Sequence, residues 1–159
     1  MIRPADADDH GAIWSIIEPV IRAGETLALP RDMSRDAALA LWFAADRSTH
    51  VWDEKGRVLG VFYIRPNQQG GGAHVANAGY VVAQDVGGRG IARAMCAASI
   101  DLARAAGYRA MQFNFVVSTN DRAVRLWEAM GFAIVGRLPD AFLHPCGDYV
   151  DALVMVRPL

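Results

Sequence analysis

Three glycines within four residues are the clearest candidate in this chain for binding chemistry. Gly87, Gly88 and Gly90 follow a strand-like apolar stretch and precede a stretch with helical periodicity. Because glycine has no side chain, the backbone N–H groups of such a loop can come close to a ligand, and the N-terminus of the next helix adds roughly half a positive charge. A strand, a glycine loop and a helix in this order predict a site for a phosphate or pyrophosphate group.

Two common phosphate-binding motifs do not fit this loop. A Walker loop needs a lysine and a serine or threonine after its glycines, and no lysine follows here. A dinucleotide-binding fingerprint needs a third glycine and an acidic residue roughly 20 residues further on. Here position 93 is Arg93, and the nearest later acid, Asp101, falls inside the expected helix. A tight turn that binds nothing stays open as the simplest alternative.

A second segment with chemical potential follows the next expected strand. Residues 111–117 alternate apolar and more polar side chains, a pattern typical of a strand with one buried face. Residues 118–120 then offer helix-capping side chains, and an apolar helical stripe runs from Ala123 to Met130. Asn120 is therefore placed at the start of a helix, where its amide can cap the helix, bind a ligand, or do both.

Together the two segments resemble the acyl-CoA-binding motifs of GCN5-related N-acetyltransferases, and the resemblance extends over nearly the whole chain. The glycine loop is similar to the motif [Q/R]xxGx[G/A]: Gly90 and Ala92 match, and Gly87 stands where the family has Gln or Arg. Residues 120–132 are similar to the motif NxxAxxLYxxxGF, except that Trp127 replaces a Tyr that protonates the leaving thiolate in many members. An indole N–H is far too weak an acid for that role.

The resemblance implies a binding site for acetyl-CoA as co-substrate and no metal. The residues that it implies as contacts lie at the end of the strand before the loop, in the loop, and at the starts of the two helices: Tyr80, Val81, Val82, Gly87, Gly88, Arg89, Gly90, Ile91, Ala92, Arg93, Asn120, Arg125 and Trp127. A backbone N–H of the strand would hold the oxyanion. Arg89 and Arg93 are the expected sources of the positive charge that Gly87 does not supply.

Three asparagines mark the expected acceptor side. Asn77, Asn114 and Asn120 have the order and spacing of a subgroup resembling the fungal acetyltransferase of proline analogues such as azetidine-2-carboxylate. The resemblance implies that Asn77 orients the acceptor or the thioester, Asn114 lines the site, and Asn120 donates a hydrogen bond to the CoA sulfur. Glu25 is a candidate for binding the amine or for acting as a base through water. A turn at Asn77, a helix cap at Asn120 and a surface carboxylate at Glu25 are the structural alternatives.

The implied reaction is direct transfer of an acetyl group from acetyl-CoA to the uncharged amine of a small molecule, such as an amino acid or a proline analogue. Tyr80 and Tyr149 are further candidates for a general acid, and His74 and His144 for a general base. Two alternatives stay open. One is an acyl-CoA-binding sensor without turnover, suggested by the two departures from the motifs, and the other is a protein N-acetyltransferase.

The periodicity of the chain predicts the elements that must position these groups. Expected strands cover residues 2–3, 50–52, 58–65, 74–82, 111–117, 133–137 and 149–156, and expected helices cover 6–23, 34–45, 91–106 and 121–130. The family resemblance implies an α/β (α+β) fold: a mixed, mostly antiparallel sheet of about seven strands flanked by about four helices. Residues 1–159 are expected to form one acetyltransferase domain.

Composition excludes several classes of protein. The net charge of −1 argues against a general nucleic-acid-binding protein. No apolar run reaches the roughly 18 residues that a membrane span needs, and no secretory signal is visible, so the cytoplasm is the expected location. Cys96 and Cys146 lack the spacing of a metal site or a disulfide framework. A monomer and a homodimer both remain possible from the sequence.

Overall fold

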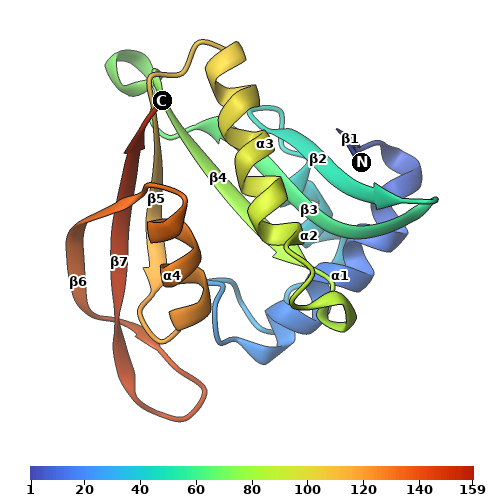
Figure 1. Ribbon diagram of the computed structural model, residues 1–159. Helices are drawn as coiled ribbons and strands as arrows, with labels where there is room; N and C mark the ends of the chain where they lie inside the picture. Colours follow the sequence, from blue (N-terminus) through green and yellow to red (C-terminus); the bar gives the residue numbers. More distant parts are fainter.

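Seven strands form a single sheet in the order β1-β2-β3-β4-β5-β7-β6 in the computed structural model, which describes residues 1–159 (Figure 1). The strands are β1 (Ile2–Pro4), β2 (Ser48–Glu54), β3 (Arg57–Pro66), β4 (Val75–Val82), β5 (Ala110–Val117), β6 (Ala133–Leu143) and β7 (Tyr149–Pro158). All neighbours are antiparallel except the parallel pair β4 and β5. The prediction of a mixed, mostly antiparallel sheet is confirmed.

Four α-helices flank this sheet. They are α1 (His10–Ala23), α2 (Arg35–Trp42), α3 (Ile91–Ala105) and α4 (Asp121–Ala129), and three short 3-10 turns cover Ala7–Asp9, Gly70–Gly72 and Gln84–Val86. The helix ends follow local chemistry: α1 ends at Gly24 in the left-handed conformation, with a φ of 65°. The start of α2 is capped by the Ser34 hydroxyl, which accepts a hydrogen bond from Ala37 N at 3.2 Å.

Two hydrophobic layers hold the helices on opposite faces of the sheet. One layer joins α1 and α2 to Val51, Val61 and Val81, and the other joins α3 and α4 to a set that includes Phe62 and Met111. Because side chains alternate along a strand, neighbours in β4 point into different layers. Any polar residue between Ala76 and Ala78 therefore faces the side of α1 and α2.

The sheet opens between β4 and β5, and this opening positions the site. The two strands pair only at Val75 with Ala110 and at Ala76 with Met111. Beyond these pairs β4 stays bonded to β3 on its other edge, while β5 continues beside β7. The carboxyl-terminal end of β4 therefore has a free edge, close to the first turns of α3 and α4.

The C-terminal hairpin differs from the prediction. Strand β6 extends to Leu143 rather than ending at Arg137, because bulges shift its register with β7 and let pairing resume beyond the irregular residues. Most of its apolar side chains stay exposed, with Val135 62% and Leu143 56% accessible, whereas Phe142 is buried. An exposed strand with irregular periodicity carries a weak sequence signal, so only its first half was predictable.

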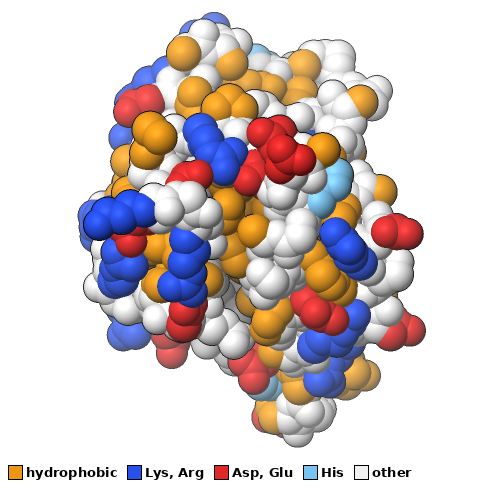
Figure 2. All heavy atoms as spheres, turned by 90° about the vertical axis from the view of Figure 1, so that its right-hand side faces the viewer, with side chains coloured by type: hydrophobic (Ala, Val, Ile, Leu, Met, Phe, Trp, Pro, Cys, Tyr) orange, Lys and Arg blue, Asp and Glu red, His pale blue; other side chains and the backbone are white.

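The surface carries charges of both signs. Figure 2 shows basic and acidic side chains interspersed over the face on which β1, α1 and the β2–β3 hairpin lie. Several charged side chains of the protein form ion pairs, among them Arg57 with Asp85 and Arg3 with Asp9. None of the helices combines the length and the apolar character that a bilayer span would require.

Candidate active site

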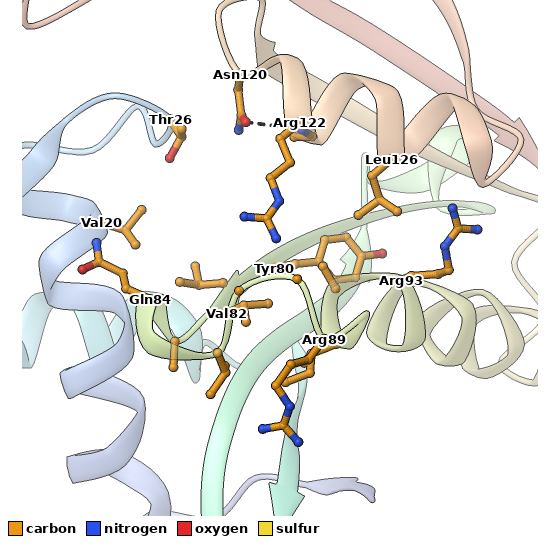
Figure 3. A pocket seen from close by; sticks show the side chains of 18 of the residues that line it. Val20, Thr26, Tyr80, Val82, Gln84, Arg89, Arg93, Asn120, Arg122 and Leu126 are labelled. Carbon is orange, nitrogen blue, oxygen red and sulfur yellow. Dashed lines mark hydrogen bonds between the residues drawn. The ribbon is translucent and has the colours of Figure 1, made fainter.

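A cavity of about 670 Å³ lies at the free end of β4, between the glycine loop, the start of α4 and the end of α1 (Figure 3). Every residue that the sequence predicted as an acetyl-CoA contact lines this cavity. The wall is completed by residues that the sequence did not assign to the site: Val20, Thr26, Leu27, Ala83, Gln84, Val86, Arg122, Ala123 and Leu126. Helical spacing from Asn120 could have indicated Ala123 on the same face, whereas no local pattern marks Val20 or Thr26.

The glycine loop is built to expose its backbone. Gly88 and Gly90 have φ angles of 80° and 78°, a conformation that side chains rarely adopt, and open space lies where a Cβ atom would stand at either residue. Gly90 is the N-cap of α3 and offers no side chain to the free N–H groups of the first turn. The loop and the helix start can therefore both receive an anion.

The cavity wall contains four arginines and no aspartate, glutamate, histidine, cysteine or lysine. Arg89 is already engaged, because its guanidinium donates to both carboxylate oxygens of Glu54 at 2.8 and 2.9 Å and points away from the cavity. This hydrogen bond lowers the pKa of Glu54. The Arg89 side chain is therefore paired with Glu54 in this structure, and it could supply the expected charge to the cavity only if this exposed ion pair opened.

The other three arginines of the cavity wall form no ion pair with a carboxylate. Arg93 lies at the outer end of the cavity, where one of its guanidinium nitrogens is 3.6 Å from the sulfur of Met130. Arg122 and Arg125 form no ion pair. A cavity lined by cations without a facing acid favours a polyanionic ligand.

The Asn120 side chain caps α4 with its oxygen and keeps its nitrogen free to donate a hydrogen bond. Its Oδ1 accepts a hydrogen bond from Ala123 N at 3.3 Å, which makes it the N-cap of α4. This bond fixes the orientation of the amide, because only the oxygen can accept it. The Nδ2 group forms no hydrogen bond within the protein and lies on the cavity side, across from Thr26 in Figure 3. The capping and ligand-binding roles are therefore compatible.

Trp127 and Tyr80 form an aromatic wall and provide no acid. The Trp127 ring is only 9% exposed and lies 5.0 Å from the Tyr80 ring. The Tyr80 hydroxyl is 2.6 Å from Ser99 Oγ, and Ser99 donates its own proton to the Cys96 carbonyl at 2.7 Å. Tyr80 is therefore the donor in this pair, and burial raises its pKa well above the ordinary value. Because its proton is held by Ser99, this arrangement argues against a role for Tyr80 as a general acid.

The remaining acid and base candidates lie outside the cavity. Tyr149 is 65% exposed at the start of β7, His74 is exposed in the turn before β4, and His144 lies in the turn between β6 and β7. Glu25 is exposed and does not line the cavity, although its neighbours Thr26 and Leu27 do. The connection that contains Glu25 therefore reaches the cavity through Thr26 and Leu27 and not through Glu25.

Asn77 and Asn114 belong to a hydrogen-bonded network and do not line the cavity. Asn77 donates to the Gln112 carbonyl at 3.0 Å and accepts from Arg65 Nε at 3.2 Å. Asn114 donates to Asn67 Oδ1 at 2.6 Å and accepts from Gln112 Nε2 at 2.9 Å. Since β4 and β5 cease to pair just before Gln112, the Asn77 side chain bridges the two strands where they separate. The network faces the side of α1 and α2.

Metal chemistry has no visible site here, because no three His, Cys, Asp or Glu side chains come together as a metal would require. The wall holds no Asp, Glu, His, Cys or Lys, and its Tyr80 hydroxyl is bonded to Ser99, so the means of catalysis that the cavity offers are hydrogen-bond donors and the alignment of reactants. The arrangement suits a polyanionic ligand that enters at the glycine loop and reaches Asn120.

Comparison with known proteins agrees with this arrangement. A family model described as the acetyltransferase (GNAT) family matches residues 9–132. A GCN5-related N-acetyltransferase from Kribbella flavida is 42% identical and superposes with a TM-score of 0.94 over 100% of this chain and 97% of that one. The N-acetyltransferase aca1 of Schizosaccharomyces pombe is 32% identical over 151 residues, covering 84% of this chain and 72% of that protein.

A more distant solved structure shares the fold alone. The phosphinothricin acetyltransferase of Sinorhizobium meliloti, solved in complex with acetyl-CoA, has a TM-score of 0.88 at 23% identity, over 100% of this chain and 88% of that one. Family membership is established by the family match and by the Kribbella and Schizosaccharomyces relatives, and not by this structural similarity. The chain therefore belongs to the acetyltransferase (GNAT) family and is an N-acetyltransferase.

Proposed function

We propose that the cavity binds acetyl-CoA and that the enzyme transfers its acetyl group to the amine of a small molecule, such as an amino acid or a proline analogue. The observation that carries this proposal is one continuous cavity that joins an open glycine loop at a helix start to the free amide donor of Asn120. The Sinorhizobium protein was solved with acetyl-CoA, which supports the same ligand for this chain.

The residues present fit the chemistry of this co-substrate. The N–H groups at Gly88, Gly90 and the first turn of α3 would bind the diphosphate. The free edge of β4 offers unpaired backbone groups to the amides of the pantetheine arm, as a sheet edge does to an added strand. The apolar wall of Val82, Leu126 and Trp127 would cover the aliphatic part of that arm.

The mechanism follows from which groups the wall holds. When bound, acetyl-CoA supplies an activated thioester. Asn120 Nδ2 would donate a hydrogen bond to the sulfur as negative charge develops there, and a backbone N–H on the free edge of β4 would hold the oxyanion. The wall holds no Asp, Glu, His, Cys or Lys that could act as a base, so the amine would arrive uncharged or lose its proton to water. Alignment of the two reactants would offset roughly 7 to 11 kcal/mol of the barrier.

A polar acceptor is favoured by the amide network between β4 and β5. Asn77 and Asn114 present amide groups on the α1 and α2 side of the opening, and Arg65, which is also 3.8 Å from an Asp46 carboxylate oxygen, places a cation beside Asn77. A small molecule with an amine and a carboxylate would find both donors and positive charge there. The roles of Asn77 and Asn114 as acceptor contacts, and membership in the subgroup that acts on proline analogues, are part of this proposal.

The test is a screen for release of free thiol from acetyl-CoA by the purified protein. The panel contains free amino acids, proline and azetidine-2-carboxylate, with peptides of varied N-terminal residue as a second arm. We expect turnover with at least one free amino acid or cyclic analogue. Turnover with peptides alone would replace the proposal by protein N-acetylation.

A sensor without turnover is the second candidate, favoured by the absence of any aspartate, glutamate or histidine from the cavity wall. Under that hypothesis acetyl-CoA would raise the melting temperature, while no amine in either arm would release thiol. The fungal N-acetyltransferase at 32% identity favours turnover instead.

A further inference from the structure

The backbone conformation at position 87 does not require a glycine. Its φ and ψ of −58° and 149° are open to any residue, in contrast to the left-handed Gly88 and Gly90. A Cβ atom at Gly87 would meet nothing closer than 3.6 Å, which is ordinary van der Waals contact. The loop could therefore carry a side chain at this position.

The Arg122 side chain occupies the space in front of Gly87. The two terminal guanidinium nitrogens of Arg122 lie 3.6 and 3.8 Å from the position that a Gly87 Cβ would take. Figure 3 shows this side chain reaching from α4 toward the glycine loop, whereas Arg89 points out on the other side of the loop. A long side chain at position 87 would compete with Arg122 for the same space.

Arg122 is also placed unfavourably unless an anion binds. It stands in the first turn of α4, where a positive charge opposes the helix dipole, and it forms no ion pair with any carboxylate. Its guanidinium instead faces the uncapped N-terminus of α3, a second positive end. Two positive groups that face one another across a cavity create a strong site for a diphosphate.

We propose that Arg122 binds the diphosphate of acetyl-CoA from α4 and replaces the Gln or Arg side chain expected at position 87. This inference rests on the proposed function, because it names the contact for the same co-substrate. Binding would then join the β4–α3 loop to α4 through one side chain. Positions 87 and 122 would be alternative sources of the same charge, because a long side chain at position 87 would need the space that Arg122 occupies.

The test compares acetyl-CoA with S-acetylpantetheine, a donor that lacks the diphosphate. Loss of one charged hydrogen-bonding partner predicts a roughly 10- to 100-fold weaker dissociation constant for acetyl-CoA in Arg122→Ala and in Arg122→Gln. Use of S-acetylpantetheine should change less than about twofold. Arg109→Ala is the matched control, because Arg109 is exposed, unpaired and outside the cavity; its affinity should equal that of the wild type.

A double variant tests the replacement itself. Gly87→Arg in the Arg122→Ala background should recover most of the lost affinity, whereas Gly87→Arg alone should bring no gain, so the two changes are strongly non-additive. Melting temperatures identify any variant that fails to fold, and Arg122→Gln covers a failure of Arg122→Ala.

Three results would overturn the inference. Wild-type affinity for acetyl-CoA in both Arg122 variants would exclude the contact. Equal losses with S-acetylpantetheine would show that Arg122 acts on another part of the site. Additive effects in the double variant would show that position 87 does not exchange with Arg122. If the wild type itself fails to bind acetyl-CoA, the proposed function fails first, which is a different result from any of these.

Discussion

Asn120 offers a sharp test of the mechanism, because its two amide atoms have separable tasks. The Oδ1 atom caps α4 through Ala123 N at 3.3 Å, and the Nδ2 atom faces the cavity without a partner. Asn120→Asp keeps an oxygen acceptor for the cap and removes the donor. Asn120→Ala removes both.

The two variants should therefore separate stability from turnover. Loss of the cap in Asn120→Ala should lower the free energy of unfolding by about 1 kcal/mol, whereas Asn120→Asp should keep it, since a carboxylate is an equally good cap and favours the helix dipole. Loss of a donor to the developing thiolate should lower kcat by roughly 10²- to 10³-fold in both variants. The carboxylate in Asn120→Asp would also repel a thiolate.

The assay is urea unfolding together with steady-state kinetics on whichever amine the screen identifies. The expected pattern is a large loss of kcat in both variants, with a loss of stability only in Asn120→Ala. If Asn120→Asp keeps the wild-type kcat, the amide does not stabilise the thiolate. If Asn120→Ala loses stability but not kcat, the residue is only a cap.

Three further outcomes are expected from the contacts described above. Gly90→Val should abolish acetyl-CoA affinity and should lower the free energy of unfolding by about 1 to 2 kcal/mol, because the backbone there is left-handed. Gly107→Val is the control, since Gly107 is also left-handed but lies outside the cavity, and it should lower only the stability. Retained affinity in Gly90→Val would contradict the diphosphate site. Tyr80→Phe should leave kcat and its pH profile unchanged while losing about 1 kcal/mol of stability with the Ser99 hydrogen bond; a changed pH profile would restore Tyr80 as an acid. Burial lowers the pKa of His50, so the folded state binds fewer protons than the unfolded chain and unfolding becomes easier as pH falls below about 6.5. Urea unfolding at pH 7.5 and 5.5 should show this loss in the wild type and a smaller loss in His50→Phe, and equal losses would assign it to other groups.

Local patterns predicted most of the fold, because each element carries its own signal. The end of α1 at Gly24, the start of α2 after Ser34 and the strand before the glycine loop match the structure. The other two helix ends do not, because α1 begins at His10 after a 3-10 turn and α2 ends at Trp42 rather than at residue 45. The hairpin of β6 and β7 was predicted least well, since Asp140 adopts a left-handed φ of 49° and the bulges there interrupt the alternation on which strand prediction depends.

The motifs predicted which backbone segments form the site, but they did not predict which charged side chains face it. A motif places backbone groups in sequence order, so Gly88 and Gly90 could be assigned to an anion site directly. The partner of a long side chain depends on what the fold brings near it. Arg89 was expected to serve the cavity, but Glu54 from the β2–β3 hairpin binds it instead.

The sequence by itself determined the family, the order of the elements and the position of the glycine loop, because these depend on periodicity and spacing along the chain. Only the tertiary structure decided which groups meet across the cavity. It placed Arg122 in front of Gly87, buried the Tyr80 hydroxyl against Ser99, and turned Asn77 to bridge β4 and β5. These contacts join residues far apart in the chain, and no local pattern records which distant side chains will share a space.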